Sequence, residues 1–269
     1  MIICFIGGGN MTTALIGGLL GRGYTVAQLR VVEINADSRA RLQQQFGVPA
    51  TADLAAGVAG SAVIVLAVKP QQLREVAVQL ASLLAGQLLL SIAAGIRATD
   101  LAIWCNSQTI VRAMPNTPAL IGSGMTGLYA LPSVSAAQRE HAQAILAAVG
   151  ETLWLQDEAM LDAVTAISGS GPAYVFYFIE ALQQAARELG FSAEDARRLS
   201  LATFLGASKL AASSSEDASV LRARVTSKNG TTERALLSMA SSHVAEHIAQ
   251  AAQAAAARSR EMGAELGEN

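Results

Sequence analysis

The stretch VTSKNGTTERAL, residues 225–236, combines four hydroxyl side chains with one glycine and one lysine, and it leads into an alanine-rich segment with helical periodicity. A polar turn in front of a helix, here expected to begin near Glu233, presents unpaired backbone N–H groups that suit a carboxylate. Ser227 and Thr231 add hydroxyl donors, and Thr232 can offer its oxygen to an N–H group of a ligand. From these residues alone, an ordinary helix N-cap formed by Thr-Thr-Glu is the simpler interpretation.

A second candidate binding segment lies at the N-terminus, where the apolar run Ile2–Ile6 leads through three glycines into a helical pattern. This order is typical of dinucleotide binding, because Gly7 permits a tight turn and Gly9 lets a pyrophosphate approach the positive end of the helix. Thr12 replaces the third glycine of the motif, which predicts slightly looser packing of the helix on the strand. The alternative is a tight turn that binds no ligand.

An acidic residue closes the second predicted strand, VVEIN at 31–35, where it would accept hydrogen bonds from both adenosine ribose hydroxyls. Glu33 would also repel the additional phosphate of NADP, so its charge favours NAD or the use of both cofactors. Arg39 is close enough in the sequence to reach that phosphate. The alternative is a Glu33 that is merely solvated.

Two further strand ends, Ala67–Pro70 and Ile92–Gly95, would lie at the same edge of a doubly wound sheet. Their small residues leave room for a ribose and a nicotinamide. Lys69 either contacts the cofactor or caps a helix. Asn116 either orients the nicotinamide, bridges two domains or holds a turn.

The totals of the chain exclude several classes of protein. The net charge of −2 over 269 residues shows no basic excess, so nucleic acid is not an expected partner. His243 and His247 lie four residues apart without a third ligand, so no metal site is expected. Cys4 and Cys105 have no framework spacing, which fits a reducing cytosol. A glycine and a glutamine interrupt the apolar stretch 80–96, so we expect a cytoplasmic protein that spans no membrane.

Short apolar runs alternate with helical patterns in the first half of the chain. The runs predict strands at 2–6, 30–34, 62–68, 88–92, 109–114, 126–130 and 152–155, with helices at 11–21, 37–46 and 71–84 between them. This alternation predicts a buried parallel sheet. Only helical patterns follow from about residue 157. The fold class is therefore α/β, with a Rossmann-like doubly wound dinucleotide-binding domain at 1–156 and an all-α domain at 157–269.

Three motifs occur in order along the chain: VRAMPNTP at 111–118, SGSGPAYVF at 168–176 and VTSKNGTT at 225–232. With them the sequence closely resembles the pyrroline-5-carboxylate reductase family, which catalyses the last step of proline biosynthesis. The likeness runs nearly end to end. It implies a Rossmann domain that uses NADPH or NADH and a helical domain that binds substrate and dimerises. It also implies intertwined homodimers, which in many members assemble further, up to decamers.

The resemblance also implies site residues at defined positions. Cofactor contacts would come from the glycine loop, the end of the second strand and the AVKP and AAG segments: Ile6, Gly7, Gly8, Gly9, Asn10, Met11, Glu33, Asn35, Ala67, Val68, Lys69, Pro70, Ile92, Ala93 and Ala94. Asn116 joins these candidates on the ground given above, as a residue that could orient the nicotinamide. Substrate contacts would be Glu158, Arg224, Ser227, Gly230, Thr231 and Thr232. Among these, Ser227 and Thr232 would act in catalysis.

The sequence departs from the usual pattern of the family at several positions. Its loop commonly reads SPGGTT, whereas Lys228 and Asn229 stand here in place of the proline and the first glycine. Asparagine tolerates the left-handed conformation better than most residues, so the turn is expected to survive. Ala218 replaces a common proline. Most members carry Asn, Ser or Arg where Glu33 and Ile34 stand, which puts a preference for NADPH, but not dinucleotide use, in question.

The reaction that the resemblance implies is reduction of 1-pyrroline-5-carboxylate to L-proline by hydride from NAD(P)H. A cyclic imine is basic enough to be protonated near neutrality, so orientation would supply most of the catalysis, roughly 7–11 kcal/mol, without a dedicated proton donor. A β-hydroxyacid dehydrogenase is one alternative, but it needs a helical lysine, and Lys209 lacks matching neighbours. A second is a non-catalytic dinucleotide-binding or redox-sensing module, which would bind the cofactor and turn over no imine.

Overall fold

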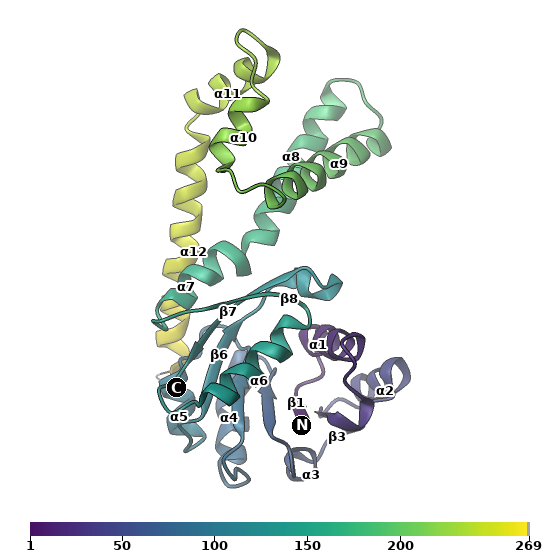
Figure 1. Cartoon of the computed structure of the whole chain (residues 1–269), viewed down its shortest axis with the longest axis vertical. Coiled ribbons are helices and arrows are strands. Elements are labelled where there is room, and N and C mark those ends of the chain that lie inside the picture. Colours follow the sequence, from purple (N-terminus) through teal and green to yellow (C-terminus); the bar gives the residue numbers. More distant parts are fainter. Residues whose placement is uncertain (268–269) are drawn as a thin grey trace. The chain divides into compact units, whose positions relative to one another are not determined.

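The computed structural model describes residues 1–267, and the chain forms two compact units (Figure 1). The first unit contains residues 1–170 together with the C-terminal segment from Ala254, and the second contains residues 171–253. One long helix, α12 (Val244–Gly267), contributes residues to both. The domain boundary expected at residue 156 stays a prediction, because compactness does not by itself define which residues bind substrate.

An eight-stranded sheet forms the middle of the first unit, in the order β3-β2-β1-β4-β5-β6-β7-β8. The strands are β1 (Ile3–Ile6), β2 (Leu29–Val32), β3 (Ala50–Thr51), β4 (Val63–Leu66), β5 (Leu88–Ser91), β6 (Ile110–Met114), β7 (Gly124–Ala130) and β8 (Gly150–Trp154). The strands from β3 to β6 are parallel, but β7 pairs antiparallel with β6 and parallel with β8. The sheet is therefore mostly parallel, as the alternation of strands and helices predicted, and it contains one antiparallel pair that the sequence did not predict.

The helices of the first unit differ in how their N-termini are satisfied. They are α1 (Asn10–Gly21), α2 (Ala36–Phe46), α3 (Leu54–Val58), α4 (Pro70–Ala81), α5 (Ala98–Trp104), α6 (Ala136–Ala147) and α7 (Met160–Val164), with short 3₁₀ turns at Val26–Gln28 and Thr117–Ile121 and a π turn, η3, at Thr165–Gly169. Asn35, Asp53 and Ser135 accept backbone N–H groups and so cap α2, α3 and α6. Neither α1 nor α4 has a side-chain cap, so their first N–H groups stay available to a ligand.

The order of the strands places these two uncapped helices together. The chain runs from β1 outward to β2 and β3, and it then returns to the other side of β1 at β4. The carboxyl ends of β1 and β4 therefore form the topological switch point, where doubly wound sheets bind their ligands. Helices α1 and α4 begin at this point, directly after Ile6 and Leu66. The fold thus predicts a ligand cleft between these two strand ends.

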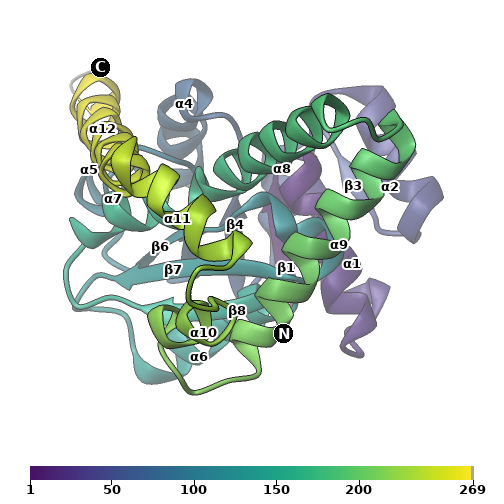
Figure 2. The ribbon, with the colours of Figure 1, turned by 90° about the horizontal axis from the view of Figure 1, so that it is seen from above.

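The two units differ strongly in how much apolar surface they bury. The first has a continuous core in which Phe5, Leu15 and Ile64 are fully enclosed. The second consists of α8 (Gly171–Glu188), α9 (Ala193–Ala212), α10 (Ala218–Arg224), α11 (Thr231–Ser241) and the first part of α12, seen from above in Figure 2. Among its residues only Ala196 and Ser200 are buried.

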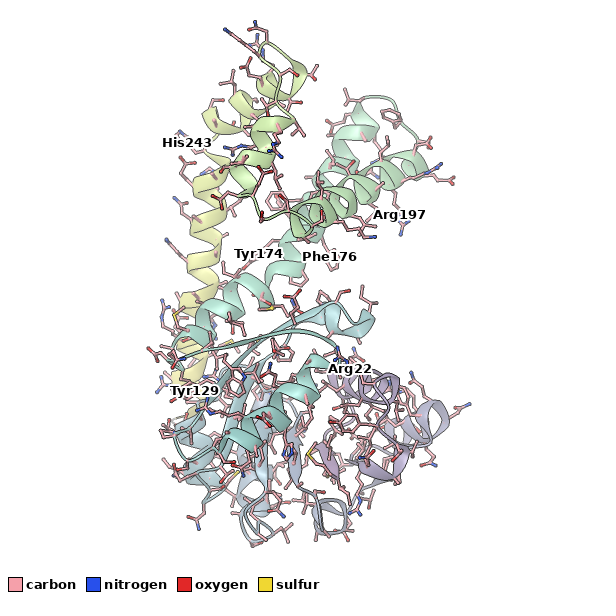
Figure 3. All side chains as sticks on the ribbon, viewed as in Figure 1. Arg22, Tyr129, Tyr174, Phe176, Arg197 and His243 are labelled. Carbon is pink, nitrogen blue, oxygen red and sulfur yellow. The ribbon has the colours of Figure 1, made fainter. Side chains whose placement is uncertain are left out.

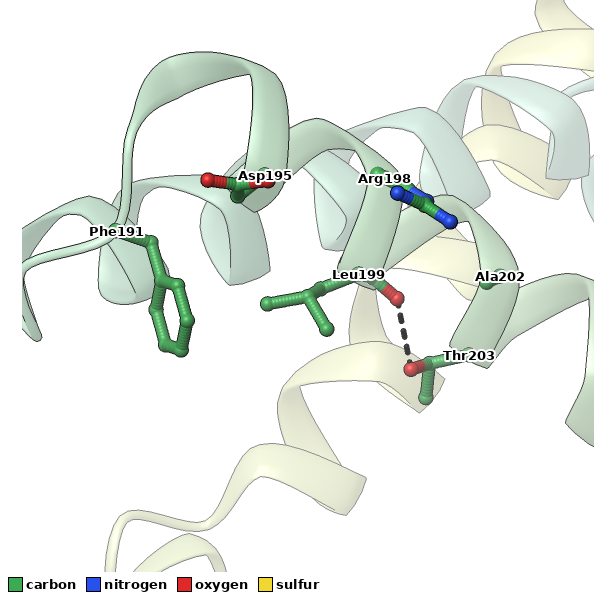
Figure 4. Close-up of a pocket in the computed structure, with 6 residues that line it drawn as sticks. All are labelled: Phe191, Asp195, Arg198, Leu199, Ala202 and Thr203. Atoms are coloured by element: carbon green, nitrogen blue, oxygen red, sulfur yellow. Dashed lines mark hydrogen bonds between the residues drawn. The ribbon is translucent and has the colours of Figure 1, made fainter.

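Large apolar side chains on the second unit are accordingly open to solvent. On α8, Phe176 is 65% exposed, and Figure 3 labels it together with Tyr174. Along α9 and the loop before it, the Phe191 ring and the Leu199 side chain line an open groove that also includes Thr203, whose hydroxyl donates to the Leu199 carbonyl oxygen (Figure 4). So much exposed apolar surface in a helical unit without a core of its own indicates a protein–protein interface.

Candidate active site

The glycine loop after β1 has the geometry of a pyrophosphate cradle. Gly7 adopts a φ of +105°, and a Cβ built there would lie 2.6 Å from the Ala67 carbonyl oxygen, so only glycine fits. Gly9 occupies the N-cap position of α1, makes no side-chain cap and has open space where its Cβ would be. The loop therefore leaves both space and free N–H groups for an anionic group.

Thr12 strengthens this loop rather than loosening it. The residue is fully buried, and its hydroxyl donates to the Gly7 carbonyl oxygen at 2.6 Å. The slightly looser packing of the helix on the strand, which the missing third glycine predicted, stays a prediction. The bond ties the first turn of α1 back to the start of the loop.

The Glu33 carboxylate is fixed at the end of β2. Its Oε2 accepts the N–H of Gly8 at 2.7 Å, and its Oε1 accepts the N–H of Asn35 at 2.8 Å. Each carboxylate oxygen can accept a second hydrogen bond, so both remain able to bind ribose hydroxyls. The carboxylate is thus held by the backbone on both sides instead of moving freely in solvent.

Two arginines of α2 lie against the same edge of the sheet. Arg39 Nη1 donates to the carbonyl oxygens of Glu33 and Ile34, at 2.7 and 2.9 Å. Arg41 Nη2 donates to the Gly8 carbonyl oxygen at 2.9 Å. Arg39 therefore reaches the end of β2, and its contact with the additional phosphate of NADP stays a prediction. The two guanidinium groups partly offset the negative charge of Glu33.

A cleft of about 650 Å³ joins these elements at the switch point. Of the predicted cofactor residues, it is lined by Ile6, Gly7, Gly8, Gly9, Glu33, Asn35, Ala67, Val68 and Lys69. Asn10, Met11, Pro70, Ile92, Ala93, Ala94 and Asn116 do not line it. Lys69 stands at the N-cap of α4 without a side-chain cap bond, so its side chain borders the cleft instead of closing the helix.

Several lining residues escaped the sequence analysis. Gln72, Glu75, Val76 and Gln79 project from one face of α4, and Ser38 comes from α2. Spacings of three and four residues place side chains on the same side of a helix, so the α4 group could have been found from the sequence once the cleft was assigned to that helix.

The side-chain amide of Asn116 makes its hydrogen bonds within the protein. Its amide nitrogen donates to the carbonyl and hydroxyl oxygens of Ser168, both at 3.1 Å, and its amide oxygen accepts the N–H of Met125 at 2.9 Å. These bonds join the turn after β6 to the start of β7 and to η3. All three residues belong to the first unit, so these bonds hold the turn within that unit. A bridge between domains and a contact with the nicotinamide both stay predictions.

The loop between α10 and α11 forms a compact turn in the second unit. Asn229 adopts the left-handed conformation, with a φ of +60°, as expected for a residue that replaces glycine. The N–H of Gly230 donates to the Ser227 carbonyl oxygen at 3.0 Å, and Glu233 Oε2 accepts the N–H of Asn229 at 2.6 Å. Helix α11 begins at Thr231, two residues before the expected start near Glu233.

This turn leaves an open set of donors at the start of α11. Gly230 is the N-cap and provides no side-chain cap, so the Thr-Thr-Glu cap considered from the sequence does not form. Among the described residues, the hydroxyls of Ser227, Thr231 and Thr232 make no hydrogen bond, and Thr232 is half-buried. Free backbone N–H groups beside three unbonded hydroxyls suit a carboxylate.

Arg224 is less available to a ligand than its charge suggests. Its guanidinium makes two bonds to the Glu216 carboxylate, with Nη2 2.6 Å from Oε1 and Nη1 2.5 Å from Oε2. Arg224 is the last residue of α10, and Glu216 lies in the loop before that helix, eight residues away. Nothing in the sequence pattern pointed to Glu216. A substrate contact through Arg224 stays a prediction and requires this pair to open or to share its charge.

Glu158 is held in the first unit by two donors on one oxygen. Its Oε1 accepts Arg112 Nη1 at 2.8 Å and the N–H of Ala98 at 2.7 Å. Arg112 is buried, and a buried cation needs a partner, so this lone charge in an apolar strand was the signal for the pair. Glu158 belongs to the first unit and the loop at 224–232 to the second, and its predicted substrate contact stays untested.

Other chemistries find little support in the described part of the chain. No group of three or more His, Cys, Asp or Glu residues there could hold a metal ion. Burial raises the pKa of the thiols of Cys4 and Cys105 to about 12, which leaves both protonated and unreactive near neutrality. Over residues 1–267 no helix has both the length and the apolar character needed to cross a bilayer.

The uncapped glycine loop, the fixed acid at the end of β2 and the cleft at the switch point define a nicotinamide-dinucleotide-dependent oxidoreductase fold. Comparison with known proteins specifies it further. Residues 158–262 match the family model for the pyrroline-5-carboxylate reductase dimerisation domain, and residues 2–95 match a model described as NADP oxidoreductase, coenzyme F420-dependent. A pyrroline-5-carboxylate reductase of Pseudomonas aeruginosa is 47% identical over 99% of this chain and 98% of its own. The chain belongs to the pyrroline-5-carboxylate reductase family.

Solved structures agree with this assignment. A pyrroline-5-carboxylate reductase from Coxiella burnetii superimposes with a TM-score of 0.92 at 38% identity, covering 97% of both chains. The Plasmodium falciparum enzyme, solved with NADP bound, has a TM-score of 0.87 at 28% identity and covers 98% of both chains. The protein is an NAD(P)-dependent oxidoreductase. The dimerisation match and the exposed apolar surface of the second unit indicate a homo-oligomer.

Proposed function

We propose that this protein reduces 1-pyrroline-5-carboxylate to L-proline with hydride from NAD(P)H, as the last step of proline biosynthesis in the cytoplasm. The observation that carries the proposal is the start of α11, where unpaired N–H groups and three unbonded hydroxyls face outward from one turn. A five-membered imino acid presents the two features that such a turn recognises, a carboxylate and an adjacent ring nitrogen.

Each residue of the turn has a distinct part in this proposal. The N–H groups at the start of α11 and the hydroxyls of Ser227 and Thr231 bind the carboxylate. Gly230 permits the close approach, because a side chain there would crowd Ser227, whose carbonyl oxygen lies 3.0 Å from the position of a Cβ. Thr232 accepts the ring N–H and keeps the imine nitrogen in register. Anchoring at two points prevents the substrate from sliding along the turn.

On the cofactor side, the chain's residues bind and orient. The free N–H groups after Gly9 hold the pyrophosphate, and the Glu33 oxygens accept the ribose hydroxyls. When bound, the reduced nicotinamide supplies the hydride. The remaining predicted contacts, among them Ala93 and Ala94, would shape the nicotinamide end of the site through their small side chains.

The protonation of the imine requires no dedicated acid in this scheme. A cyclic imine is largely protonated near neutral pH, and the resulting iminium is a strong electrophile. The oxygen of Thr232 accepts a hydrogen bond from the N–H group of this cation and so stabilises it. Most of the rate enhancement then comes from orientation, for which well-placed reactants gain roughly 7–11 kcal/mol.

The position of Glu33 favours NADH over NADPH. Two backbone N–H groups fix its carboxylate, so it cannot swing away from the 2′-phosphate of NADPH. Arg39 lies beside the same strand end and can offset part of this repulsion, so NADPH is used as well but less efficiently. The matched variants Glu33→Ser and Arg39→Gln separate the two charges, since they should shift cofactor preference in opposite directions.

The assembly follows from the second unit. Its exposed apolar side chains need a second copy to cover them, so we propose a homodimer as the basic unit, with dimers able to assemble further, up to a decamer. Light scattering distinguishes these states. A monomer would contradict the proposal.

The activity is tested by following NADH absorbance with purified protein and pyrroline-5-carboxylate, with small 2- and 3-hydroxyacids and NAD⁺ as the matched reverse assay. We expect oxidation of NADH with the imine and no turnover of the hydroxyacids. Turnover of hydroxyacids would favour a hydroxyacid dehydrogenase, and cofactor binding without any turnover would favour a sensing module.

A further inference from the structure

A second pocket, separate from the cofactor cleft, lies in the first unit between the segment before α5, the region of α7 and the end of α12. Its volume is about 320 Å³, and none of its residues lines the cofactor cleft. The lining comes from the segment after β5, from β6, from α7 with the turn before it, and from α12: Gly95, Arg97, Arg112, Glu158, Ala159, Asp162, Ser259, Arg260 and Gly263.

The carboxylates around this pocket have hydrogen-bond partners, whereas two of its three guanidinium groups have none among the described residues. Its two carboxylates already have donors, since Glu158 Oε1 accepts Arg112 and the N–H of Ala98, and Asp162 Oδ1 accepts the Ser259 hydroxyl at 2.6 Å. The side chains of Arg97 and Arg260, by contrast, make no hydrogen bond or ion pair within residues 1–267. Three guanidinium groups and two carboxylates leave an excess of one positive charge.

The buried side chain of Arg112 lies at the bottom of the pocket. It is only 6% exposed, and a single nitrogen, Nη1, is bonded to Glu158. Its other guanidinium nitrogens have no hydrogen-bond partner among the described residues. None of these unbonded nitrogens is sealed from solvent, so they are open to a ligand in the pocket, and the planar fork of arginine matches phosphate and carboxylate groups.

We propose that this pocket binds a small oxyanion, a free anion or a small metabolite with one phosphate or carboxylate group, between Arg97, Arg112 and Arg260. Its volume is at the lower end of the range for small-molecule sites, about 300–1,000 Å³. Because Arg260 belongs to α12 and Arg112 to β6, the anion links the C-terminal helix to the sheet. Binding therefore stabilises the attachment of α12 to the first unit.

The test is thermal unfolding of the intact protein, titrated with inorganic phosphate against sodium chloride at equal ionic strength. Saturating NADH is present throughout, so that the cradle at the glycine loop is occupied. We expect phosphate to raise Tm beyond the effect of chloride, with at least fivefold weaker apparent affinity in Arg97→Gln and in Arg260→Gln. Both side chains are exposed, so the substitutions leave the core intact.

Two further variants sharpen the result. Arg258→Gln changes a neighbouring arginine of α12 that is paired with Glu261 and Glu265, and it should keep the parent's response. Asp162→Asn removes a negative charge from the lining while retaining an acceptor for Ser259, and it should tighten phosphate binding.

Parallel titrations with acetate and L-proline identify the form of the anion. Because the turn at 227–232 is itself expected to bind a carboxylate, a stronger response than to phosphate assigns a carboxylate to this pocket only where Arg97→Gln and Arg260→Gln diminish it. A response no larger than that of chloride for every anion would overturn the proposal. So would a phosphate response that is undiminished in both Arg97→Gln and Arg260→Gln.

Discussion

Replacing Thr232 by alanine separates substrate binding from the stability of α11. Thr232 is the second residue of α11, is half-buried, and its hydroxyl makes no hydrogen bond within the described chain. Alanine has a higher helix propensity than threonine, so the variant should keep or slightly raise the stability of the helix. Any loss of activity then reports on the missing hydroxyl.

The size of the loss follows from the bond that the substrate would lose. A hydrogen bond to a charged group contributes about 1.5–3 kcal/mol, so Thr232→Ala should lower kcat/KM about ten- to a hundredfold. The assay is the initial rate of NADH oxidation over a range of pyrroline-5-carboxylate concentrations, with Tm measured on the same samples. Thr232→Ser retains the hydroxyl and should recover most of the activity.

Thr226 provides the matched control in the same loop. Its hydroxyl is already used, since it donates to the Arg222 carbonyl oxygen at 2.6 Å. Thr226→Ala should therefore change kcat/KM by no more than about twofold, the usual range for a surface substitution. If Thr232→Ala kept full activity, or lost no more than Thr226→Ala, the assignment of this turn to the substrate would be wrong.

Three further predictions concern the first unit. Gly9→Ala should fold normally, because its Cβ meets open space, but it should raise the Kd for NADH measured by fluorescence. Gly7→Ala should instead lower Tm, because Gly7 has a φ of +105° and a backbone oxygen lies 2.6 Å from the new Cβ. Normal NADH affinity in Gly9→Ala would contradict the pyrophosphate cradle. Glu33→Ser should shift the ratio of kcat/KM for NADH over NADPH toward NADPH by about tenfold, the effect of removing a nearby charge, and an unchanged ratio would exclude repulsion as the cause of the preference. Burial raises the pKa of the Cys4 and Cys105 thiols from 9.0 to about 12, so both should resist a thiol reagent at neutral pH in the folded protein. Their contribution to the free energy of unfolding should be complete below pH 9 and decline as the pH rises from 9 toward 12. Rapid labelling of the folded protein would show that the thiols are accessible.

The parts that could be predicted from the sequence depend on local patterns. Apolar runs and glycines specified β1, its turn and α1, because strand, turn and helix follow each other along the chain. The left-handed conformation of Asn229 was predictable from the resemblance, which places this asparagine where the family commonly has glycine. Strand β3 was missed because its two residues are too few to form a pattern.

The parts that could not be predicted depend on contacts between distant segments. Glu33 lies 25 residues from the Gly8 N–H that fixes its carboxylate, and no periodicity relates the two. The pairing of Arg112 with Glu158 spans 46 residues and occupies an acid that the resemblance assigns to the substrate. Strand β7 runs antiparallel to β6 after the turn at 115–122, where the Asn116 amide oxygen accepts the N–H of Met125, and the apolar pattern within the strand carries no information on its direction.

The most direct test is a crystal structure of the protein with L-proline and the oxidised cofactor bound together. The account predicts the proline carboxylate within hydrogen-bonding distance of the N–H groups at the start of α11, with the ring nitrogen beside Thr232 and the pyrophosphate at the N-terminus of α1. Proline bound away from residues 227–232, or a pyrophosphate away from residues 7–11, would contradict it.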